Sequence, residues 1–424
     1  MTAPVAAEAL LAAPAVDHAS VTLSIPEACA RASAYAAPLI EADIVPVAQA
    51  TGRTLAEPVV ALVATPPFTQ SAMDGYAVVA RDGIAVGARI QVVGRVPAGS
   101  RGGKIARGQA TRLFTGAPIP EGADAVVMQE HVDRDGDVIV LRRPIRAGDN
   151  IRIKGEDVQP LETLLQVGER LDARHVALAA AQGIGTFKVR ARPRVAVIST
   201  GDELRQAADA LEPSAIYDSN RPMLLALIEQ SGLVPIDGGW VPDRPEMIAD
   251  RLQCAAERAD LVITSGGASL GEEDHALEAL ERAGGSGETL KIALKPGKPA
   301  VVGRIRTAAY LGLPGNPVSS LVCWLLLGRT MTCSLEGREL PRRLGFPLPS
   351  KSAFARRAGR TEFVPVKLVD GPEGLGVEIF GRGGSARLQP LAEADGLAEI
   401  AAENGGVRPG DVILFHPLRG AFAI

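Results

Sequence analysis

The stretch that decides the fold reads Val195-Ala196-Val197-Ile198-Ser199 and runs directly into Thr200-Gly201-Asp202-Glu203. An extended run that is apolar on both faces is typical of a central strand in a parallel sheet. Further strand and helix patterns alternate along residues 222–264. Strands and helices that alternate at this spacing form right-handed βαβ units. Residues 191–335 are therefore predicted to form a doubly wound α/β domain.

Four loops rich in glycine and proline follow predicted strands of this domain. They are Ser199-Thr200-Gly201-Asp202-Glu203, Ser265-Gly266-Gly267, Lys295-Pro296-Gly297-Lys298-Pro299 and Leu313-Pro314-Gly315-Asn316-Pro317. In an open α/β sheet, loops at the carboxyl ends of parallel strands meet in one crevice, where ligands bind. Carboxylates hold Mg²⁺, while lysines and backbone N–H groups hold phosphate oxygens. The predicted ligand is therefore a phosphate-bearing molecule handled with a divalent cation.

The other parts of the chain predict further domains, so the expected fold class is multidomain α/β plus β. Residues 1–20 are expected to be a disordered tail, because small residues and prolines offer little to bury. Residues 61–155 carry short β runs and predict an inserted β domain, and residues 336–424 predict a small β-barrel or sandwich. Residues 21–60 and 156–190 predict a linker domain of mixed helices and strands, with helical patterns from Ser24 and from Pro46 to Thr51.

Composition restricts the classes of function. Of 424 residues, 46% are apolar and 22% are charged, which is enough apolar content for several globular cores. The 45 Lys and Arg and the 49 Asp and Glu residues are interspersed and give a net charge of −4, so nucleic acid is not a predicted partner. The start of the chain lacks the positive charge of a signal peptide, and no apolar run reaches the ~20 residues that span a bilayer. A soluble, cytoplasmic protein with no membrane partner is expected.

The four cysteines, Cys29, Cys254, Cys323 and Cys333, show no C-x-x-C spacing. Three of them lie in apolar helical patterns. They are predicted to be buried thiols rather than disulfide partners or metal ligands.

The loop before the last helix of the α/β domain is a candidate phosphate site. Asn316 is well placed as the N-cap and Pro317 as the first helical residue. The N–H groups of Val318, Ser319 and Ser320 are then expected to point at the crevice, an arrangement suited to a phosphate. An ordinary helix that begins with proline explains the same pattern.

Lys295 and Lys298 lie on either side of a Pro-Gly turn. Held at a strand end by Pro296 and Pro299, they are interpreted as a clamp for an anion. Isolated lysines are usually solvated, so an ordinary surface role for both lysines remains the alternative.

Three carboxylates near strand ends, Glu203, Asp243 and Asp274, are the candidate metal ligands. Carboxylates that share a crevice repel one another unless a cation compensates their charge. Mg²⁺ fits this set better than Zn²⁺, because His275 is the only imidazole nearby and no thiolate accompanies it. Asp243 has an alternative structural role as a cap of the helix predicted to begin near Pro245.

Several enzyme classes find no support in the sequence. There is no Ser-His-Asp grouping of suitable spacing, no G-x-x-x-x-G-K-[ST] phosphate loop and no Rossmann fingerprint. An NTPase of that kind and a nicotinamide enzyme are therefore not expected.

The string Pro66-Pro67-Phe68-Thr69-Gln70-Ser71-Ala72-Met73-Asp74-Gly75-Tyr76-Ala77 contains an Asp-Gly turn that opens a strand, a common hairpin device. Combined with the four loops, it closely resembles the molybdopterin molybdenumtransferase family, which includes the E domain of gephyrin. The motifs of the resemblance occur in the family's order over about residues 22–420, and they are Ser71 to Ala77, Thr115-Gly116-Ala117-Pro118, Lys154-Gly155-Glu156-Asp157, Ser199 to Leu204, Ser265 to Ser269, Lys295 to Pro299 and Pro314 to Ser319. Each motif alone is weak, but the joint match is highly specific.

The resemblance implies a homodimer with four domains per chain, in which the linker domain also serves dimerisation. The active site is expected between the α/β domain of one subunit and the β domain of the other. Such enzymes bind adenylylated molybdopterin, cleave its pyrophosphate linkage with Mg²⁺, insert molybdenum from molybdate into the dithiolene and release AMP. The implied partners are a molybdopterin adenylyltransferase and molybdoenzyme acceptors.

Site residues are carried over from the family by position. The matching catalytic residues are Asp74, Thr115, Asp157, Glu203, Asp243, Asp274, Lys295 and Lys298. The matching substrate-binding residues are Gly266, Gly267, Ser269, Pro314, Asn316, Pro317, Ser319, Arg360 and Ser385. Arg360 and Ser385 correspond to the molybdate pocket, and the alternative for Arg360 is an ordinary pair with Glu362 on a β surface.

Two rival functions remain at this point. A competence-damage-type nucleotide pyrophosphatase shares this kind of α/β core, but it would not need the string from Ser71 to Ala77. A non-catalytic, gephyrin-like scaffold could lose Lys295, Lys298 or Asp274 without penalty, and all three are present.

Overall fold

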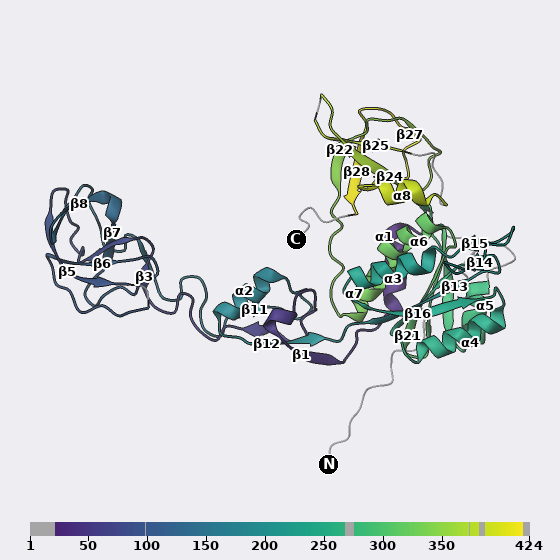
Figure 1. The fold of residues 1–424 in the computed structure, drawn as a ribbon, viewed down its shortest axis with the longest axis horizontal. Coiled ribbons are helices and arrows are strands. Elements are labelled where there is room, and N and C mark those ends of the chain that lie inside the picture. The colour runs from purple at the N-terminus through teal and green to yellow at the C-terminus, as the bar shows by residue number, and fades with distance from the viewer. Residues whose placement is uncertain (1–21, 98, 268–274, 373, 381–385, 419–424) are drawn as a thin grey trace, which may run out of the picture. The chain divides into compact units, whose positions relative to one another are not determined.

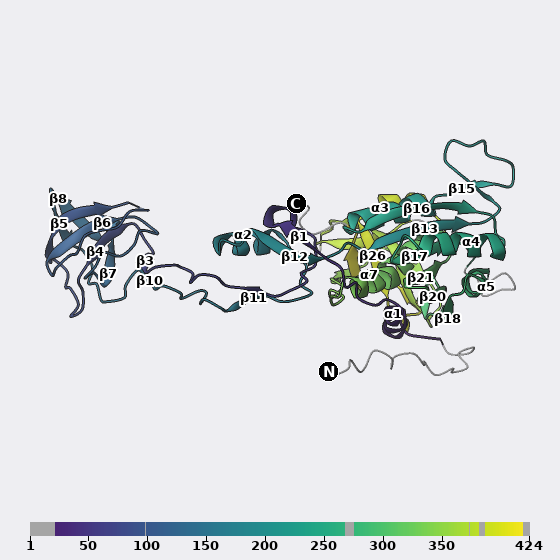
Figure 2. The same cartoon turned by 90° about the horizontal axis from the view of Figure 1, so that it is seen from below.

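The computed structural model describes residues 22–97, 99–267, 275–372, 374–380 and 386–418. The chain forms two compact units. Of the described residues, those up to Glu41 and those from Arg190 onward form the large unit, and Ala42–Val189 form the small unit. Figure 1 labels the elements of both units, and Figure 2 shows them from a second direction.

The α/β part of the large unit is built on one six-stranded sheet. Its elements are α1 (Ile25–Ala34), β13 (Arg194–Thr200), β14 (Leu204–Arg205), β15 (Ile216–Tyr217), α3 (Asn220–Gln230), β16 (Val234–Val241), α4 (Pro245–Ala256), β17 (Leu261–Ser265), α5 (His275–Arg282), β18 (Ser286–Lys291), β19 (Leu294–Lys295), β20 (Pro299–Ile305), β21 (Ala308–Leu313), α6 (Pro317–Cys323), the π-helical turn η3 (Trp324–Gly328) and α7 (Arg329–Leu335). The strand order is β16-β13-β17-β21-β20-β18, and the first four strands are parallel.

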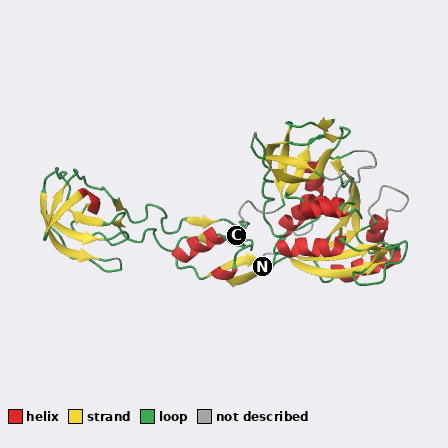
Figure 3. Ribbon diagram, turned by 45° about the horizontal axis from the view of Figure 1, so that its top comes forward, coloured by secondary structure: helices red, strands yellow, loops and turns green. Residues whose placement is uncertain are grey.

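Helices cover both faces of this sheet (Figure 3). Val195 and Val197 of β13 belong to the apolar core that includes α1, α3 and α6, whereas Ala196 and Ile198 belong to the core with α4 and α5. Successive residues of a strand point to opposite faces, so a strand packed on both sides must be apolar throughout. The apolar run from Val195 onward is therefore the central strand that its sequence predicts.

Residues 22–41 lie in the large unit, although the sequence pattern grouped them with the linker segment 156–190. The first helix is confirmed: Ser24 caps α1, and the Ser24 backbone N–H donates in turn to the Glu27 carboxylate. Leu23 forms a parallel bridge with Ile292. Because the apolar face of α1 packs against the α/β core, burial decides the domain to which this helix belongs.

The C-terminal part of the large unit is mostly β. Its elements are β22 (Phe346–Pro349), β23 (Phe354–Ala355), β24 (Thr361–Val369), β25 (Gly376–Ile379), α8 (Leu388–Glu393), β26 (Gly396–Ile400), β27 (Gly406–Val407) and β28 (Val412–Pro417). The main sheet has the order β19-β24-β26-β28-β22, with β25 paired to β24. Strand β19 comes from the α/β part, so one short strand joins the two parts of this unit through hydrogen bonds.

The small unit contains a six-stranded sheet of its own, of order β7-β4-β6-β5-β9-β8. Its elements are β1 (Ala42–Pro46), the 3-10 turn η1 (Val47–Gln49), β2 (Val59–Val60), β3 (Gln70–Ser71), β4 (Gly75–Val78), β5 (Arg89–Val96), β6 (Gln109–Leu113), β7 (Ala125–Met128), η2 (Gln129–His131), β8 (Val132–Asp135), β9 (Val138–Leu141), β10 (Ile151–Arg152), β11 (Thr163–Leu165), α2 (Ala173–Ala181) and β12 (Thr186–Arg190). Tyr76 and Val78 pack on one face of this sheet and Ala77 on the other. The helix predicted from Pro46 to Thr51 is wrong in extent, since only the single turn η1 forms there.

The continuous helix Pro317–Leu335, which spans α6, η3 and α7, has a mean hydropathy of 1.4 and would suffice in length and composition to cross a membrane. Within the protein, 83% of its most apolar window is buried. Trp324 is among its fully buried side chains. The burial is that of a core helix, which explains why it is apolar all round.

All four cysteines are free thiols, but their exposure differs. Cys323 and Cys333 are buried as expected, and Cys29 is half-buried. Cys254 is exposed on α4, contrary to the expectation of burial. Burial raises the pKa of the Cys323 thiol to about 12.

We expect iodoacetamide at pH 8 to label Cys254 of the native protein and to leave Cys323 unmodified, because alkylation requires an accessible thiolate. Peptide mass spectrometry over a time course checks this, and Cys254→Ser is the control that should remove the fast phase. Labelling of Cys323 at the rate of Cys254 in the native protein would contradict the burial described above.

Candidate active site

The register of the α/β sheet brings the four glycine- and proline-rich loops to one edge. Ser199 of β13 pairs with Ser265 of β17, which pairs with Leu313 of β21. On the other side of β13, Thr200 pairs with Val241, the last residue of β16. Antiparallel β20 begins at this edge, because its residue Val301 pairs with Gly312. All four loops therefore leave the sheet from neighbouring positions, as the sequence predicted.

Close backbone approach at this edge depends on Gly266. Its φ is +108°, and a Cβ atom there would lie 2.3 Å from the carbonyl oxygen of Thr200. Any side chain would also be strained at this φ. Gly267 likewise has a positive φ of +69°. Two of the predicted substrate-binding glycines are thus required by the backbone itself.

Asn220, at the start of α3, joins two of the loops and was not found from the sequence. Its side-chain N–H group donates to the Ser265 hydroxyl at 2.8 Å and to the Gly315 carbonyl at 2.6 Å. The side chain is buried, so both bonds form away from water. The only sequence signal was the polar run Asp218-Ser219-Asn220 before a helix, which fits an ordinary cap equally well.

The carboxylate loops after β13 and β16 also meet. The Asp243 backbone N–H donates to Asp202 Oδ1 at 3.2 Å. Glu203 is exposed and folds back over Gly201, where a Cβ atom would lie 2.6 Å from Glu203 Oε2. The N-cap of α4 is Arg244, without a side-chain capping bond, so Asp243 does not fill the capping position that was its structural alternative.

Glu203 and Asp243 therefore lie on adjoining loops, and both offer the hard oxygen ligands that Mg²⁺ prefers. Asp274 and Ser269 lie outside the described residues. Within the described part of the chain, no group of three or more Asp, Glu, His or Cys side chains is close enough to hold a metal ion. The donor chemistry fits Mg²⁺, and the third predicted ligand falls in a segment that the structure does not describe.

The start of α6 differs from its prediction in two details. Asn316 is the N-cap and Pro317 the first helical residue, but the Asn316 side chain makes no capping bond. The Ser320 N–H donates to the Asn316 carbonyl at 2.9 Å and is not available to a phosphate. Val318 and Ser319 therefore carry the backbone donors that this first turn can offer. Pro314 lies at this edge too, directly after the end of β21.

The two lysines of the predicted anion clamp have different surroundings. Lys295 Nζ lies 2.9 Å from Glu362 Oε1, and the Glu362 side chain is only 5% exposed. Lys298 is half-buried and makes no ion pair with any residue that the structure describes. Between them, Gly297 has a φ of +112° and accepts a hydrogen bond from Cys323 Sγ at 3.6 Å. The turn is thus packed onto α6, and Lys298, unlike Lys295, has no carboxylate partner among the described residues.

Arg360 does not form the ordinary pair with Glu362 that was its alternative role. Glu362 instead lies against Lys295 and Arg356. Arg360 is half-buried, and its backbone carbonyl accepts a hydrogen bond from Arg356. Ser385, its predicted companion in the molybdate pocket, lies outside the described residues.

In the small unit, Asp74 and Thr115 come together. Asp74 Oδ1 accepts hydrogen bonds from the Thr115 backbone N–H and from its hydroxyl, both at 2.8 Å. The backbone bond, followed by the hydroxyl bond, holds the pKa of Asp74 below its usual value. Asp157 is exposed on a separate loop, tied through its own N–H to the Thr65 carbonyl at 3.0 Å.

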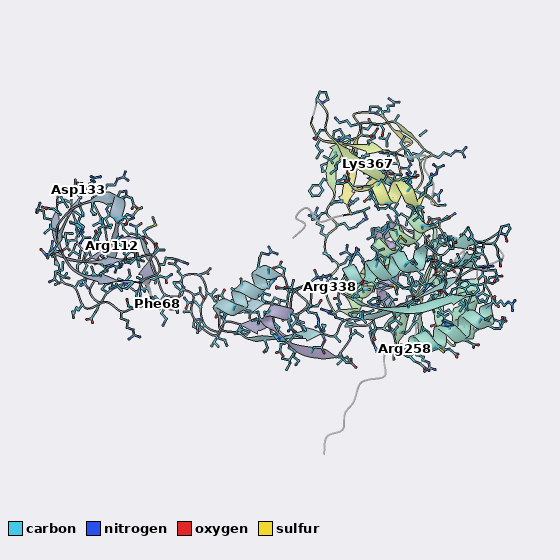
Figure 4. All side chains as sticks on the ribbon, in the orientation of Figure 1. Phe68, Arg112, Asp133, Arg258, Arg338 and Lys367 are labelled. Atoms are coloured by element: carbon cyan, nitrogen blue, oxygen red, sulfur yellow. The ribbon has the colours of Figure 1, made fainter. Side chains whose placement is uncertain are left out.

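Arg112 is a further charged residue of this region that sequence patterns did not reveal (Figure 4). Its guanidinium donates to the Gly75 carbonyl at 3.0 Å and to the Gln129 side chain. The guanidinium also lies over two aromatic rings. Its central carbon is 5.1 Å from the centroid of the Tyr76 ring and 5.0 Å from that of the Phe114 ring. These contacts fix a cation beside Asp74, where it also lowers the pKa of that carboxyl.

Comparison with known families matches almost the whole chain. The MoeA N-terminal region (domain I and II) matches residues 23–183, a probable molybdopterin binding domain matches residues 196–332, and the MoeA C-terminal region (domain IV) matches residues 347–418. These three regions together contain all the candidate site residues.

Individual relatives agree with this assignment. A molybdopterin molybdenumtransferase of Haemophilus influenzae is 35% identical over 378 residues, which cover 87% of this chain and 92% of the relative. A molybdopterin molybdenumtransferase 2 of Mycobacterium tuberculosis is 36% identical over 84% of this chain and 90% of the relative. The crystal structure of a molybdopterin biosynthesis MoeA protein from Pyrococcus horikoshii superposes with a TM-score of 0.77 at 28% identity and covers 94% of this chain and 100% of that one.

We expect Lys298→Ala to weaken binding of AMP by roughly 1.5 to 3 kcal/mol, the range for hydrogen bonds to a charged group, with little change in the melting temperature. The side chain is half-buried and has no ion-pair partner among the described residues, so its loss opens no core cavity. Calorimetric titration with AMP and thermal unfolding, measured together, check this. Lys351→Ala, which removes a half-buried lysine between β22 and β23, is the control. A large fall in melting temperature with unchanged affinity would show that Lys298 is structural.

Thr115→Val is expected to raise the pKa of Asp74 toward its usual value without reaching it. The backbone hydrogen bond from residue 115, which lowers this pKa more than the hydroxyl bond does, remains in the variant. A carboxyl whose pKa is depressed on folding stabilises the protein above its unfolded-state pKa, and that contribution is lost as the pH falls through the folded value. Thr115→Val should therefore be less stable than the wild type above the unfolded-state pKa, and this difference should vanish as the pH falls through the folded pKa of Asp74. A ¹³C NMR titration of the Asp74 carboxyl measures the shift, with Thr163→Val as the control, and an unchanged Asp74 titration would contradict the role of the hydroxyl.

Proposed function

Because this chain belongs to the molybdopterin molybdenumtransferase family and is an enzyme of molybdenum cofactor biosynthesis, we propose that it inserts molybdenum from molybdate into adenylylated molybdopterin and releases AMP. The observation that carries this proposal is the convergence of four ligand-binding loops at one edge of the α/β sheet. Open α/β sheets bind nucleotides and phosphates at this edge.

In this proposal, backbone and lysine groups hold the phosphate end of the substrate. Gly266 and Gly267 allow the ligand to approach the backbone closely, since no Cβ atom intervenes. The N–H groups of Val318 and Ser319 face it from the start of α6, where the helix dipole favours an anion. Lys298 supplies a full positive charge.

Glu203 and Asp243, together with Asp274, are the residues that would hold Mg²⁺. When bound, Mg²⁺ neutralises charge on phosphate oxygens and makes the pyrophosphate linkage more susceptible to cleavage. The contribution of the protein is to keep two carboxylate loops side by side, which the hydrogen bond from the Asp243 N–H to Asp202 does.

The small unit is proposed to supply a second set of groups to the same substrate. Asp74 is held ionised by Thr115, and Arg112 beside it offers a fixed guanidinium. We propose that the chain works as a homodimer, so that the small unit of one chain serves the large unit of another. A molybdopterin adenylyltransferase would deliver the substrate and molybdoenzymes would accept the product, in the cytoplasm.

Mixed dimers test this arrangement. Asp74→Ala and Lys298→Ala chains, each inactive alone, should regain up to half of the wild-type AMP release when combined as heterodimers. Each heterodimer would contain one site with Lys298 from one chain and Asp74 from the other. Molybdate-dependent AMP release from purified, doubly tagged heterodimers is the measurement.

Heterodimers of Lys298→Ala with Glu203→Ala are the matched control, because both residues belong to the large unit and no intact site should result. Verified Asp74→Ala and Lys298→Ala heterodimers without activity would place both residues in the site of one chain.

A further inference from the structure

A buried ion cluster lies where the α/β part of the large unit meets the C-terminal sheet. The Glu362 carboxylate, 5% exposed, lies 2.9 Å from Lys295 Nζ and 3.0 Å from Arg356 Nε. The Arg356 side chain is 1% exposed, whereas that of Lys295 is 47% exposed. One anion is thus shared by two cations, and the cluster carries a net positive charge.

The fold places these groups through strand pairing. Strand β19 pairs with β24 in parallel, and Lys295 is the register partner of Glu362. The Thr361 N–H donates to the Ala293 carbonyl at 2.9 Å and holds the same junction. This strand pairing therefore places Lys295 of the α/β part next to the Glu362 carboxylate of the C-terminal sheet.

Arg356 is fixed more firmly than Lys295. Its guanidinium donates to the carbonyls of Ile400 and Ala401, the latter at 2.8 Å, and to the carbonyl of Arg360. With both terminal nitrogens bonded to backbone carbonyls and its side chain buried, Arg356 has little freedom, and its nearby charge already compensates that of Glu362. The second cation is not required to balance the carboxylate, so the Lys295 contact calls for another explanation.

A lysine side chain that is half in water ordinarily samples many rotamers, and ordering it costs conformational entropy. The contact with Glu362 removes that freedom while it occupies only part of the ammonium group, which has three donors. The remaining donors stay available at the exposed end of the side chain. The bond with Glu362 therefore orients Lys295 in advance for a ligand.

We propose that Glu362 is a positioning residue that holds Lys295 for molybdate, together with Arg360. Arg360 lies two residues before Glu362, and its backbone is tied to the same cluster through Arg356. Cationic side chains suit a tetrahedral dianion, and the pairing of β19 with β24 brings Lys295, at the end of β19, to the same junction as Arg360, which directly precedes β24. This inference rests on the proposed function, because it takes molybdate as the oxyanion.

A double-mutant cycle tests the proposal on the full-length protein. Glu362→Gln, Lys295→Ala and the double variant are compared by the molybdate concentration at half-maximal AMP release, by calorimetric titration with molybdate alone and by thermal unfolding. If Glu362 acts through Lys295, each single variant should raise the half-maximal molybdate concentration about tenfold or more, and the double variant should be no worse than Lys295→Ala. Affinity for AMP alone should stay within about twofold of wild type.

Glu362→Asp covers the case in which the loss of a buried charge prevents folding. This variant keeps a carboxylate beside Arg356 but draws it back from Lys295, so it should fold and still weaken molybdate binding. Glu399→Gln is the matched control, because Glu399 is an ion-paired carboxylate of the neighbouring strand β26 that contacts His416 instead of Lys295.

Effects of Glu362→Gln and Lys295→Ala that multiply in the double variant would overturn the positioning role, and so would a Glu362→Asp protein that titrates molybdate as wild type does. Both results leave the proposed function in place. A Lys295→Ala protein with unchanged molybdate dependence would remove Lys295 itself from the molybdate site, and the positioning role with it. If the wild-type enzyme released no AMP in a molybdate-dependent manner, that result would instead contradict the proposed function.

Discussion

The parallel pairing of β13, β17 and β21 is the constraint on which the large unit depends. Ser199, Ser265 and Leu313 lie level in the register, so the loops that follow them start from one edge. The loops can approach closely because Gly266 carries no Cβ atom, which would otherwise lie 2.3 Å from the Thr200 carbonyl. Asn220 then ties the ends of β17 and β21 together through two hydrogen bonds. The described beginnings of these loops are therefore held in place by the sheet register and by hydrogen bonds.

Ion pairs in this protein differ widely in how much they contribute to the stability of the fold. Surface pairs such as Arg107 with Asp82 are exposed on both sides and contribute about 0 to 1 kcal/mol. The cluster of Glu362, Arg356 and Lys295 is different, because a buried carboxylate must be compensated or the fold loses stability. This requirement links the C-terminal sheet to the lysine loop of the α/β part. The contact between Glu362 and Lys295 therefore both joins the C-terminal sheet to the α/β part and orients the Lys295 side chain.

In the small unit, the uncharged donors of Thr115 keep the Asp74 carboxyl ionised by lowering its pKa. Thr115 gives two hydrogen bonds to a single oxygen of Asp74, and the second Asp74 oxygen remains for other contacts. Arg112 is placed beside this pair by a backbone carbonyl and two aromatic rings. A negative group directly before β4 and a positive group on the neighbouring strand β6 thus interact electrostatically. Such a pair suits a substrate that carries both phosphate and donor groups.

The sequence by itself determined the elements and the family. The apolar run from Val195, the cap at Ser24 and the glycines at 266 and 267 follow from local rules of burial, capping and backbone conformation. The joint set of motifs is specific enough to identify the family from the sequence. Tertiary structure alone decided that Lys295 pairs with Glu362, that Cys254 is exposed and that residues 22–41 join the α/β core. These outcomes depend on register and packing between segments far apart in the chain, and local patterns in one segment carry no information about the partner that will face it.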